Sequence, residues 1–178
     1  MDEFWVFGYG SLMWNPGFSY EERIQGRMIG YRRSLCVRSW HHRGTKEMPG
    51  LVLGLDRGGS CRGVAFRVAL RDREETIDYL RERELVTHVY VERSLPVRLD
   101  DGRKVQALTY VVDRGHLQYG GAVSVEEAAR IVNRAVGVSG PNPVYVANTV
   151  AHLREMGIRD HWLEQVVSEI ERLEGVVA

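Results

Sequence analysis

The sequence predicts an α+β protein whose sheet is mostly antiparallel and whose helices pack against it. Its first two thirds alternate short apolar runs with glycine-rich breaks, which is typical of strands joined by turns. The last third instead spaces apolar residues three and four apart, as amphipathic helices do. Asp100-Asp101-Gly102 between two strand-like runs is a hairpin signal. Strands followed by helices of this kind indicate an α+β architecture.

The strand-like segments occupy most of the chain up to residue 112. Gly26 and Gly30 interrupt a long second segment, which predicts a bend or bulge in that strand. Asp56-Arg57-Gly58-Gly59-Ser60 is a strong turn signal and is expected to separate two strands. The predicted strands are 4–8, 23–37, 51–55, 63–68, 87–93, 97–99 and 104–112.

Four helices are predicted, one between the strands and three after them. Ser124 is followed three residues later by Glu127, which fits a capping box at a helix start. No repeat or long linker divides the chain, so residues 1–178 are expected to form a single domain. The helices of about 124–174 are expected to pack on it. The predicted helices are 72–85, 125–136, 144–156 and 160–173, the last with Leu163, Val166, Val167, Ile170 and Leu173 along one face.

Composition argues against several classes of partner. Lys and Arg total 24, as do Asp and Glu, and the charges alternate in sign, whereas a nucleic-acid-binding protein usually has a basic stripe. The chain opens with the acidic Met1-Asp2-Glu3, and no run approaches the ~20 apolar residues of a membrane helix. We therefore expect a soluble, cytoplasmic protein that binds neither nucleic acid nor membrane.

The sequence offers no strong metal or nucleophile motif. Cys36 and Cys61 lie far apart in apolar runs, so we interpret both as buried core residues. His41-His42 would point in opposite directions if extended, and no HExxH pattern occurs, so no metal or cofactor is expected. Ser11 lies in GYGSL, which is not the GxSxG elbow of a hydrolase.

The segment from Gly8 to Gly17, GYGSLMWNPG, is the most unusual in the chain. Two glycines at a strand end let the backbone approach a ligand and aim several N–H groups at one point. Such an arrangement can hold a carboxylate or an oxyanion. The pattern alone is weak, and on spacing alone an ordinary turn after an edge strand is the favoured interpretation.

Glu84 is the second candidate. On a helical wheel it lies seven residues beyond Ile77 and four beyond Leu80, on the apolar face of helix 72–85, whereas Glu75 and Glu82 point elsewhere. Burial would raise the pKa of the Glu84 carboxyl toward the range of a general acid or base. Pairing of a helix-end carboxylate with a nearby arginine remains the alternative interpretation.

These segments together resemble the ChaC-type γ-glutamylcyclotransferases over nearly the whole chain, from about residue 4 to 155. The opening signature is VFGYGSLMWNPGF at 6–18, and Tyr79-Leu80-Arg81-Glu82-Arg83-Glu84 resembles the segment with the family's acid/base glutamate. Further matching segments are SWHHRG at 39–44, Pro49-Gly50, CRGVA at 61–65, and Ser139-Gly140-Pro141-Asn142 with Tyr145.

The resemblance implies a barrel-like, γ-glutamylcyclotransferase-like fold and assigns site residues. Glu84 is implied to be catalytic, and the turn is implied to bind the γ-glutamyl group mainly through its backbone. Tyr145 matches a family tyrosine near the substrate, although its residue pattern alone favours packing. The implied substrate-binding residues are Val6, Phe7, Gly8, Tyr9, Gly10, Ser11, Leu12 and Tyr145. This chain departs from some members at Leu51, where they have arginine, and at Leu85-Val86-Thr87, where they have glycines.

The implied activity is cleavage of glutathione to 5-oxoproline and Cys-Gly without metal or nucleotide, a lyase reaction. Two other hypotheses remain open at this point. The protein could be a cyclotransferase for another γ-glutamyl amine or peptide, or a non-catalytic γ-glutamyl-binding regulator of cation transport.

Overall fold

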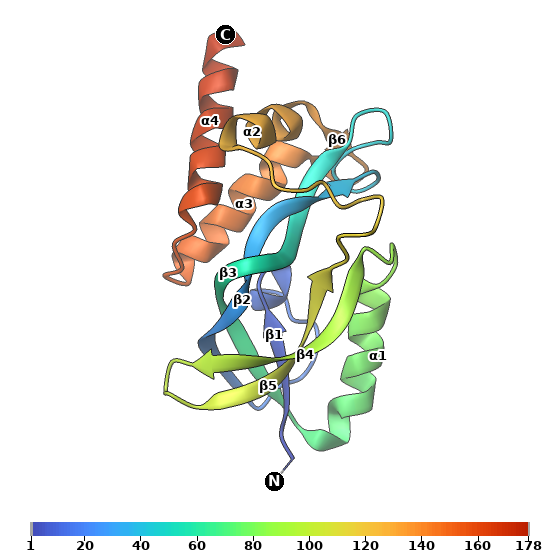
Figure 1. Ribbon diagram of the computed structural model, residues 1–178, viewed down its shortest axis with the longest axis vertical. Helices are drawn as coiled ribbons and strands as arrows, with labels where there is room; N and C mark the ends of the chain where they lie inside the picture. The colour runs from blue at the N-terminus through green and yellow to red at the C-terminus, as the bar shows by residue number, and fades with distance from the viewer. Residues whose placement is uncertain (1, 178) are drawn as a thin grey trace. The chain divides into compact units, whose positions relative to one another are not determined.

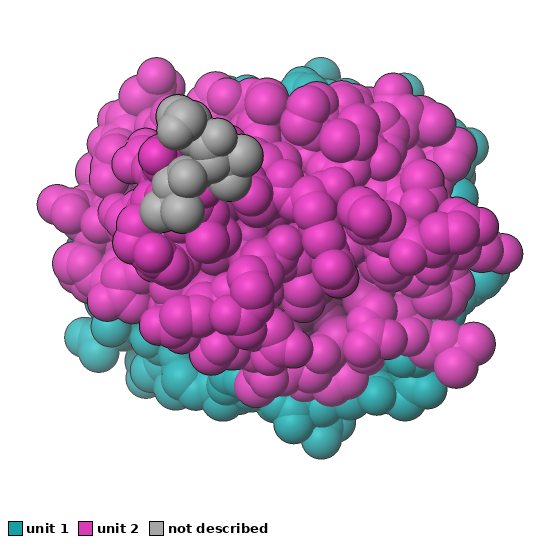
Figure 2. All heavy atoms as spheres, turned by 90° about the horizontal axis from the view of Figure 1, so that it is seen from above, with its two compact units in different colours: residues 1–33, 55–116 teal, residues 34–54, 117–178 magenta. Residues whose placement is uncertain are grey.

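The computed structural model describes residues 2–177, which form two compact units (Figure 1). The first unit contains residues 1–33 and 55–116, and the second contains residues 34–54 and 117–178; Figure 2 colours them teal and magenta. Two long strands, β2 (Glu22–Ser39) and β3 (Gly50–Val68), each contribute residues to both units. The single-domain organisation of residues 1–178 stays a prediction.

The β-strands β1 to β5 form a closed barrel in the order β1-β3-β2-β4-β5. β1 (Phe4–Gly8) pairs antiparallel with β3, where Val6 faces Phe66, and parallel with β5 (Lys104–Val112), where Val6 faces Leu108. β4 (Tyr90–Leu99) and β5 form an antiparallel hairpin around the predicted turn at 100–102. The predicted α+β class with a mostly antiparallel, barrel-like sheet is therefore confirmed.

The continuous apolar run of β1 is explained by burial on both faces of the strand. Trp5 and Phe7 pack inside the barrel, whereas Phe4 and Val6 belong to a second cluster outside it. This alternation is the two-residue period of a β-strand. All five barrel strands contribute to the interior cluster: Trp5, Phe7, Met28, Leu55, Cys61, Ala65, Val97, Leu99, Ala107 and Val111.

Helix α1 (Arg73–Glu84) packs on the outer face of the barrel, after the short 3₁₀-helix η2 (Leu70–Asp72). Ile77 and Leu80, the apolar face predicted from the sequence, contact the outer cluster that contains Val6 and Tyr110. Leu80 is fully buried, so α1 is anchored near its C-terminal turn. That turn carries Glu84.

The predicted turn at 56–60 is wrong, because β3 runs without interruption from Gly50 to Val68. Gly58 and Gly59 adopt positive φ values of 99° and 66°, so the strand changes direction locally without ending. The buried Asp56 carboxylate accepts a 2.8 Å bond from Arg114 Nε, which satisfies this buried polar group. Likewise, the predicted strands 87–93 and 97–99 are one strand, β4, and residues 87–89 lie outside it.

The second unit contains helices α2 (Val125–Arg134), α3 (Asn142–Glu155) and α4 (His161–Val177), with a two-stranded sheet of β6 (Val136–Gly137) and β7 (Gly140–Pro141). Ser124 Oγ accepts a 3.1 Å bond from the Glu127 amide, so the predicted cap is confirmed. Helix α2 ends two residues earlier than predicted, because the chain becomes extended at Ala135 and enters β6. Buried apolar side chains in these helices are Ala128, Ala129, Val132, Val146, Val150, Leu153, Leu163, Val166 and Ile170.

Cys36 and Cys61 are buried thiols, as predicted. Within residues 2–177, no helix is long and apolar enough to cross a membrane. No three His, Cys, Asp or Glu side chains in the same residues are grouped so that they could hold a metal ion.

Candidate active site

The loop after β1 forms a short 3₁₀-helix, η1 (Ser11–Met13), directly after Gly10. The first amide that donates within this helix is that of Met13, which bonds Gly10 O at 2.9 Å, followed by those of Trp14 and Asn15, which bond Ser11 O. The N–H groups of Ser11 and Leu12 precede these donors, so the helix itself does not use them. Gly10 has a φ of −133°, so a left-handed backbone is not the reason for this glycine.

Several carbonyl oxygens of this loop are bound by arginines. Arg33 Nε donates to Tyr9 O at 2.7 Å, Arg23 Nη2 to Met13 O at 3.3 Å, and Arg83 Nη1 to Asn15 O at 2.7 Å. Arg33 also bonds Arg62 O at 2.6 Å, which fixes the start of the loop to β3. The carbonyl groups of the loop are therefore bound by positively charged guanidinium groups. The positive charge around the loop would stabilise an anionic group bound at its N–H groups.

Glu84 ends helix α1 beside this loop. Its side chain is 19% exposed, and its Oε1 lies 3.7 Å from Nε of Arg83. Burial raises the pKa of the Glu84 carboxyl above its ordinary value of 4.5, while the charge of Arg83 lowers it by less. Glu75 and Glu82 are exposed, so the helical-wheel prediction separated the three carboxylates correctly.

Glu84 also influences the electrostatics of the neighbouring strands. Burial is the main reason that the pKa of Tyr110 on β5 is raised; its hydrogen bond to Glu92 on β4 is the second, and the charge of Glu84 adds to it. Tyr110 OH donates to Glu92 Oε1 at 2.8 Å, and Arg81 pairs with Glu92 at 3.0 Å. These contacts satisfy Glu92 and hold its pKa low. Of the two carboxyl groups, Glu84 is therefore the one whose pKa is raised.

Arg83 joins the loop to the end of α1. Its Nη2 donates to Ser11 Oγ at 2.8 Å, and its Nη1 to Tyr79 OH at 3.0 Å. Glu84 and the loop residues 11–16 are therefore arranged around one guanidinium group. The structure brings two of the sequence-predicted features, the GYGSL turn and Glu84, into one place.

The other predicted binding residues of the first unit differ in accessibility. Ser11 is exposed and Tyr9 is half-buried, whereas the side chains of Val6, Phe7 and Leu12 are buried in hydrophobic clusters. A side chain at Gly8 would meet Leu12 Cβ at 3.0 Å, so the strand end and the turn approach closely at this glycine. The side chains of Val6, Phe7 and Leu12 are therefore not accessible to a ligand.

Tyr145 lies in the second unit, in the first turn of α3. Its hydroxyl accepts a 3.0 Å bond from the Leu53 amide, and the guanidinium carbon of Arg43 lies 5.5 Å from its ring centroid. The buried Asn142 side chain bonds both the amide and the carbonyl of Leu51, at 2.8 and 2.9 Å. The segments 39–44, 49–50 and 139–145, which carried the family resemblance, thus meet within the second unit.

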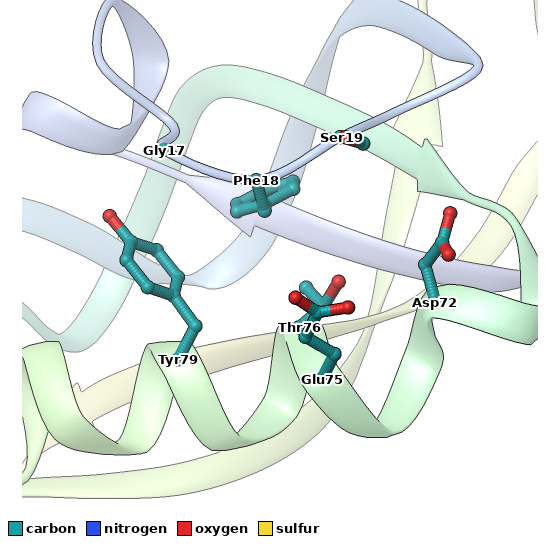
Figure 3. A pocket seen from close by; sticks show the side chains of 7 residues that line it. All are labelled: Gly17, Phe18, Ser19, Asp72, Glu75, Thr76 and Tyr79. Atoms are coloured by element: carbon teal, nitrogen blue, oxygen red, sulfur yellow. The ribbon is translucent and has the colours of Figure 1, made fainter.

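A cavity of about 440 Å³ lies between residues 17–19 and helix α1 (Figure 3). The Tyr79 ring points from the helix toward Gly17, where an added Cβ would meet the tyrosine hydroxyl at 2.0 Å. Glu84 does not line this cavity, whose lining residues are Gly17, Phe18, Ser19, Asp72, Glu75, Thr76 and Tyr79. The cavity adjoins the candidate site through Tyr79 and Gly17.

Sequence reasoning missed the arginines that hold the loop. The chain is rich in arginine, and nothing in the local pattern of Arg33 or Arg23 distinguishes them. Arg83 had one signal, because it is four residues beyond Tyr79 and therefore lies on the same helix face. That face contacts the loop.

Comparison with known proteins identifies the family of this chain. The model of the ChaC-like protein family matches residues 4–173. The glutathione-specific gamma-glutamylcyclotransferase of Escherichia coli K12 is 34% identical over 169 residues, which cover 95% of this chain and 73% of the relative. The glutathione-specific gamma-glutamylcyclotransferase 1 of Danio rerio is 38% identical over 158 residues, which cover 84% and 79%.

A solved structure supports the fold. A crystal structure of the yeast γ-glutamylcyclotransferase specific to glutathione superposes with a TM-score of 0.83 at 22% identity, and the match covers 97% of each chain. The segments that resemble the family in sequence form the candidate site in the first unit and the contacts around Tyr145 in the second. The family match over nearly the whole length shows that this chain belongs to the ChaC-like family.

Proposed function

We propose that this protein is a γ-glutamylcyclotransferase that cleaves glutathione to 5-oxoproline and Cys-Gly. The observation that carries the proposal is the half-buried Glu84 carboxyl, whose pKa is raised, beside a loop whose Ser11 and Leu12 amides are not used by the turn. The names of the Escherichia coli and Danio rerio relatives support glutathione as the substrate.

The reaction is intramolecular. The substrate's α-amino nitrogen attacks its own γ-carbonyl carbon, a five-membered lactam forms, and the amide bond to the cysteine nitrogen breaks. Glu84 as a carboxylate takes a proton from the α-ammonium group, and as an acid returns one to the departing amine. Closing a five-membered ring has a high effective molarity, so the protein chiefly folds the glutamyl chain back and transfers protons.

We infer that the loop of residues 9–12 binds a negatively charged group of the substrate. The N–H groups of this loop would hold either the α-carboxylate or the oxyanion that develops on the γ-carbonyl. The arginines that bind the loop carbonyls would stabilise either anion, because they place positive charge around the loop. The Tyr145 hydroxyl accepts a hydrogen bond from the Leu53 amide within the second unit.

We place this activity in the cytoplasm with a small γ-glutamyl compound as the only partner. The balanced charge of the chain supports the absence of a nucleic-acid partner. Cys36 and Cys61, two buried thiols, suit a reducing compartment. The proposed steps use carboxyl and amide groups, so we expect turnover without an added metal.

The test is incubation of the purified protein with glutathione and a chelator, with assay of 5-oxoproline and Cys-Gly. We expect both products in equal amounts. A panel of γ-glutamyl amines and dipeptides in the same assay identifies a different preferred substrate. Activity only after a divalent metal is restored would refute the metal-free steps. Tight binding of glutathione without turnover of any γ-glutamyl compound would instead support a regulatory binding protein.

A further inference from the structure

We propose that Arg83 is a positioning residue for this reaction, whose guanidinium group fixes the loop after β1 and the Glu84 carboxylate in one arrangement and orients the Ser11 hydroxyl as a donor to the substrate. The inference rests on the proposed function and extends it to a residue that does not itself transfer a proton.

The contacts of Arg83 extend across the whole loop. Nη1 donates to Asn15 O at 2.7 Å and approaches Pro16 O at 3.3 Å, and Nη2 donates to Ser11 Oγ at 2.8 Å. Nε lies 3.7 Å from Glu84 Oε1. One rigid planar group thus contacts both ends of the segment 11–16 and the candidate proton acceptor.

The guanidinium is itself held in place on helix α1. Nη1 donates to the hydroxyl of Tyr79, one turn earlier, at 3.0 Å. The Arg83 side chain is only 21% exposed, so water competes little for these bonds. The Tyr79 hydroxyl also lies against Gly17, at the end of the loop, where no larger residue fits. A shift of Arg83 would therefore move the loop relative to Glu84.

The bond to Ser11 determines the direction of the serine proton. Arginine has donors and no acceptor, so Ser11 Oγ must accept from Nη2 and keeps its O–H for another partner. Ser11 is exposed, so that O–H is available to a ligand. An acceptor such as a substrate carboxylate or carbonyl oxygen fits it.

Charge gives Arg83 a second effect, which acts on Glu84. Its cation lowers the pKa of the Glu84 carboxyl and opposes the larger increase that burial causes. The charge of Glu84 also acts on Tyr110 of β5, together with the charges of Glu92 on β4 and Arg81 on α1, which pair with each other. Arg83 is thus the cation that faces Glu84 directly.

A lysine at position 83 would supply the charge but not the contacts of the guanidinium group. A single ammonium supplies charge but cannot reach Ser11, Asn15 and Tyr79 at once, as the guanidinium fork does. The charge effect and the positioning effect can therefore be separated by two substitutions.

The experiment compares Arg83→Gln and Arg83→Lys with Arg73→Gln, a matched control that removes the same charge from the exposed start of the same helix. We expect the KM for glutathione to rise by about tenfold to 100-fold in both Arg83 variants, because the loop is misplaced. In Arg83→Gln the acid limb of the pH profile should move to higher pH, since the pKa of Glu84 rises when the cation is lost. In Arg83→Lys that limb should stay near its wild-type position.

A merely structural arginine would give a different pattern. The melting temperature would fall, but KM and the pH profile of the folded fraction would match those of Arg73→Gln, and this result would overturn the inference while glutathione turnover by the wild type stands. If Arg83→Gln does not fold, Arg83→Lys and Ser11→Ala retain the test, and a KM unchanged in both refutes the positioning role. A wild type that turns over no γ-glutamyl compound refutes the proposed function and the inference together.

Discussion

Replacement of Glu84 by glutamine separates proton transfer from packing at the candidate site. The amide is nearly isosteric with the carboxyl group and still forms hydrogen bonds, but it cannot accept the substrate's proton. If Glu84 is the acid/base residue, kcat should fall by about 100-fold or more. That loss corresponds to an increase of about 2.7 kcal/mol or more in the activation free energy. Substrate binding should persist, because the loop of residues 9–12 is unchanged.

The effect of this substitution on stability follows from the contacts of Arg83. The guanidinium lies 3.7 Å from Glu84 and keeps its bonds to Ser11, Asn15 and Tyr79 when the carboxylate is gone. The lost ion pair should therefore cost no more than about 1 kcal/mol. Removal of a partly buried charge offsets some of that cost. We expect the free energy of unfolding to stay within about 1 kcal/mol of wild type at neutral pH.

The pH dependence of stability provides an independent check of Glu84. Because its pKa is higher in the folded protein than the ordinary 4.5, the folded state binds more protons than the unfolded state above about that pH. The contribution of Glu84 to stability therefore falls as pH rises from about 4.5 through the folded pKa, and then levels off. The glutamine variant lacks this decline, so its stability relative to wild type should increase over that window.

The assays are initial rates with glutathione and urea unfolding at several pH values, with Glu82→Gln as the control on the exposed side of the same helix. A folded Glu84→Gln protein with near wild-type kcat would refute the catalytic assignment. A loss of several kcal/mol of stability with unchanged kcat would instead identify Glu84 as a structural partner of Arg83.

Two further substitutions test the binding residues. Gly10→Val should raise KM more than it lowers the melting temperature, because a side chain there would block close approach of a ligand to the turn; a large loss of melting temperature with normal KM would identify a structural turn. Tyr145→Phe removes the acceptor of the Leu53 amide and should lower the free energy of unfolding by about 1 kcal/mol, as measured by urea titration. A raised KM in the same variant would support the substrate contact predicted for Tyr145, and an unchanged KM would contradict it.

Local patterns in the sequence determined much of the secondary structure and one side of the site. The apolar run 4–8, the hairpin turn at 100–102 and the helix with Ile77, Leu80 and Glu84 on one face were all predicted correctly. These features depend on the periods of strand and helix and on turn chemistry, which act over a few residues. The inward position of Glu84 follows from the same helical period.

The tertiary structure alone decided the features that depend on residues distant in the chain. Strand β3 continues through Asp56, whose carboxylate binds Arg114, 58 residues later, and a local turn pattern contains no information about so distant a partner. Barrel closure likewise requires the parallel pairing of β1 with β5, which brings Val6 against Leu108.

Arg83 combines a position that the local sequence determines with contacts that only the tertiary structure determines. Its place on the helix follows from the sequence, but its role follows from acceptors at Ser11 and Asn15, about 70 residues earlier in the chain. Every arginine offers the same fork of donors, so only the folded backbone determines which one faces the loop and the catalytic candidate. The helical period directed the Glu84 carboxyl inward; the packing of α1 on the barrel placed the loop beside it.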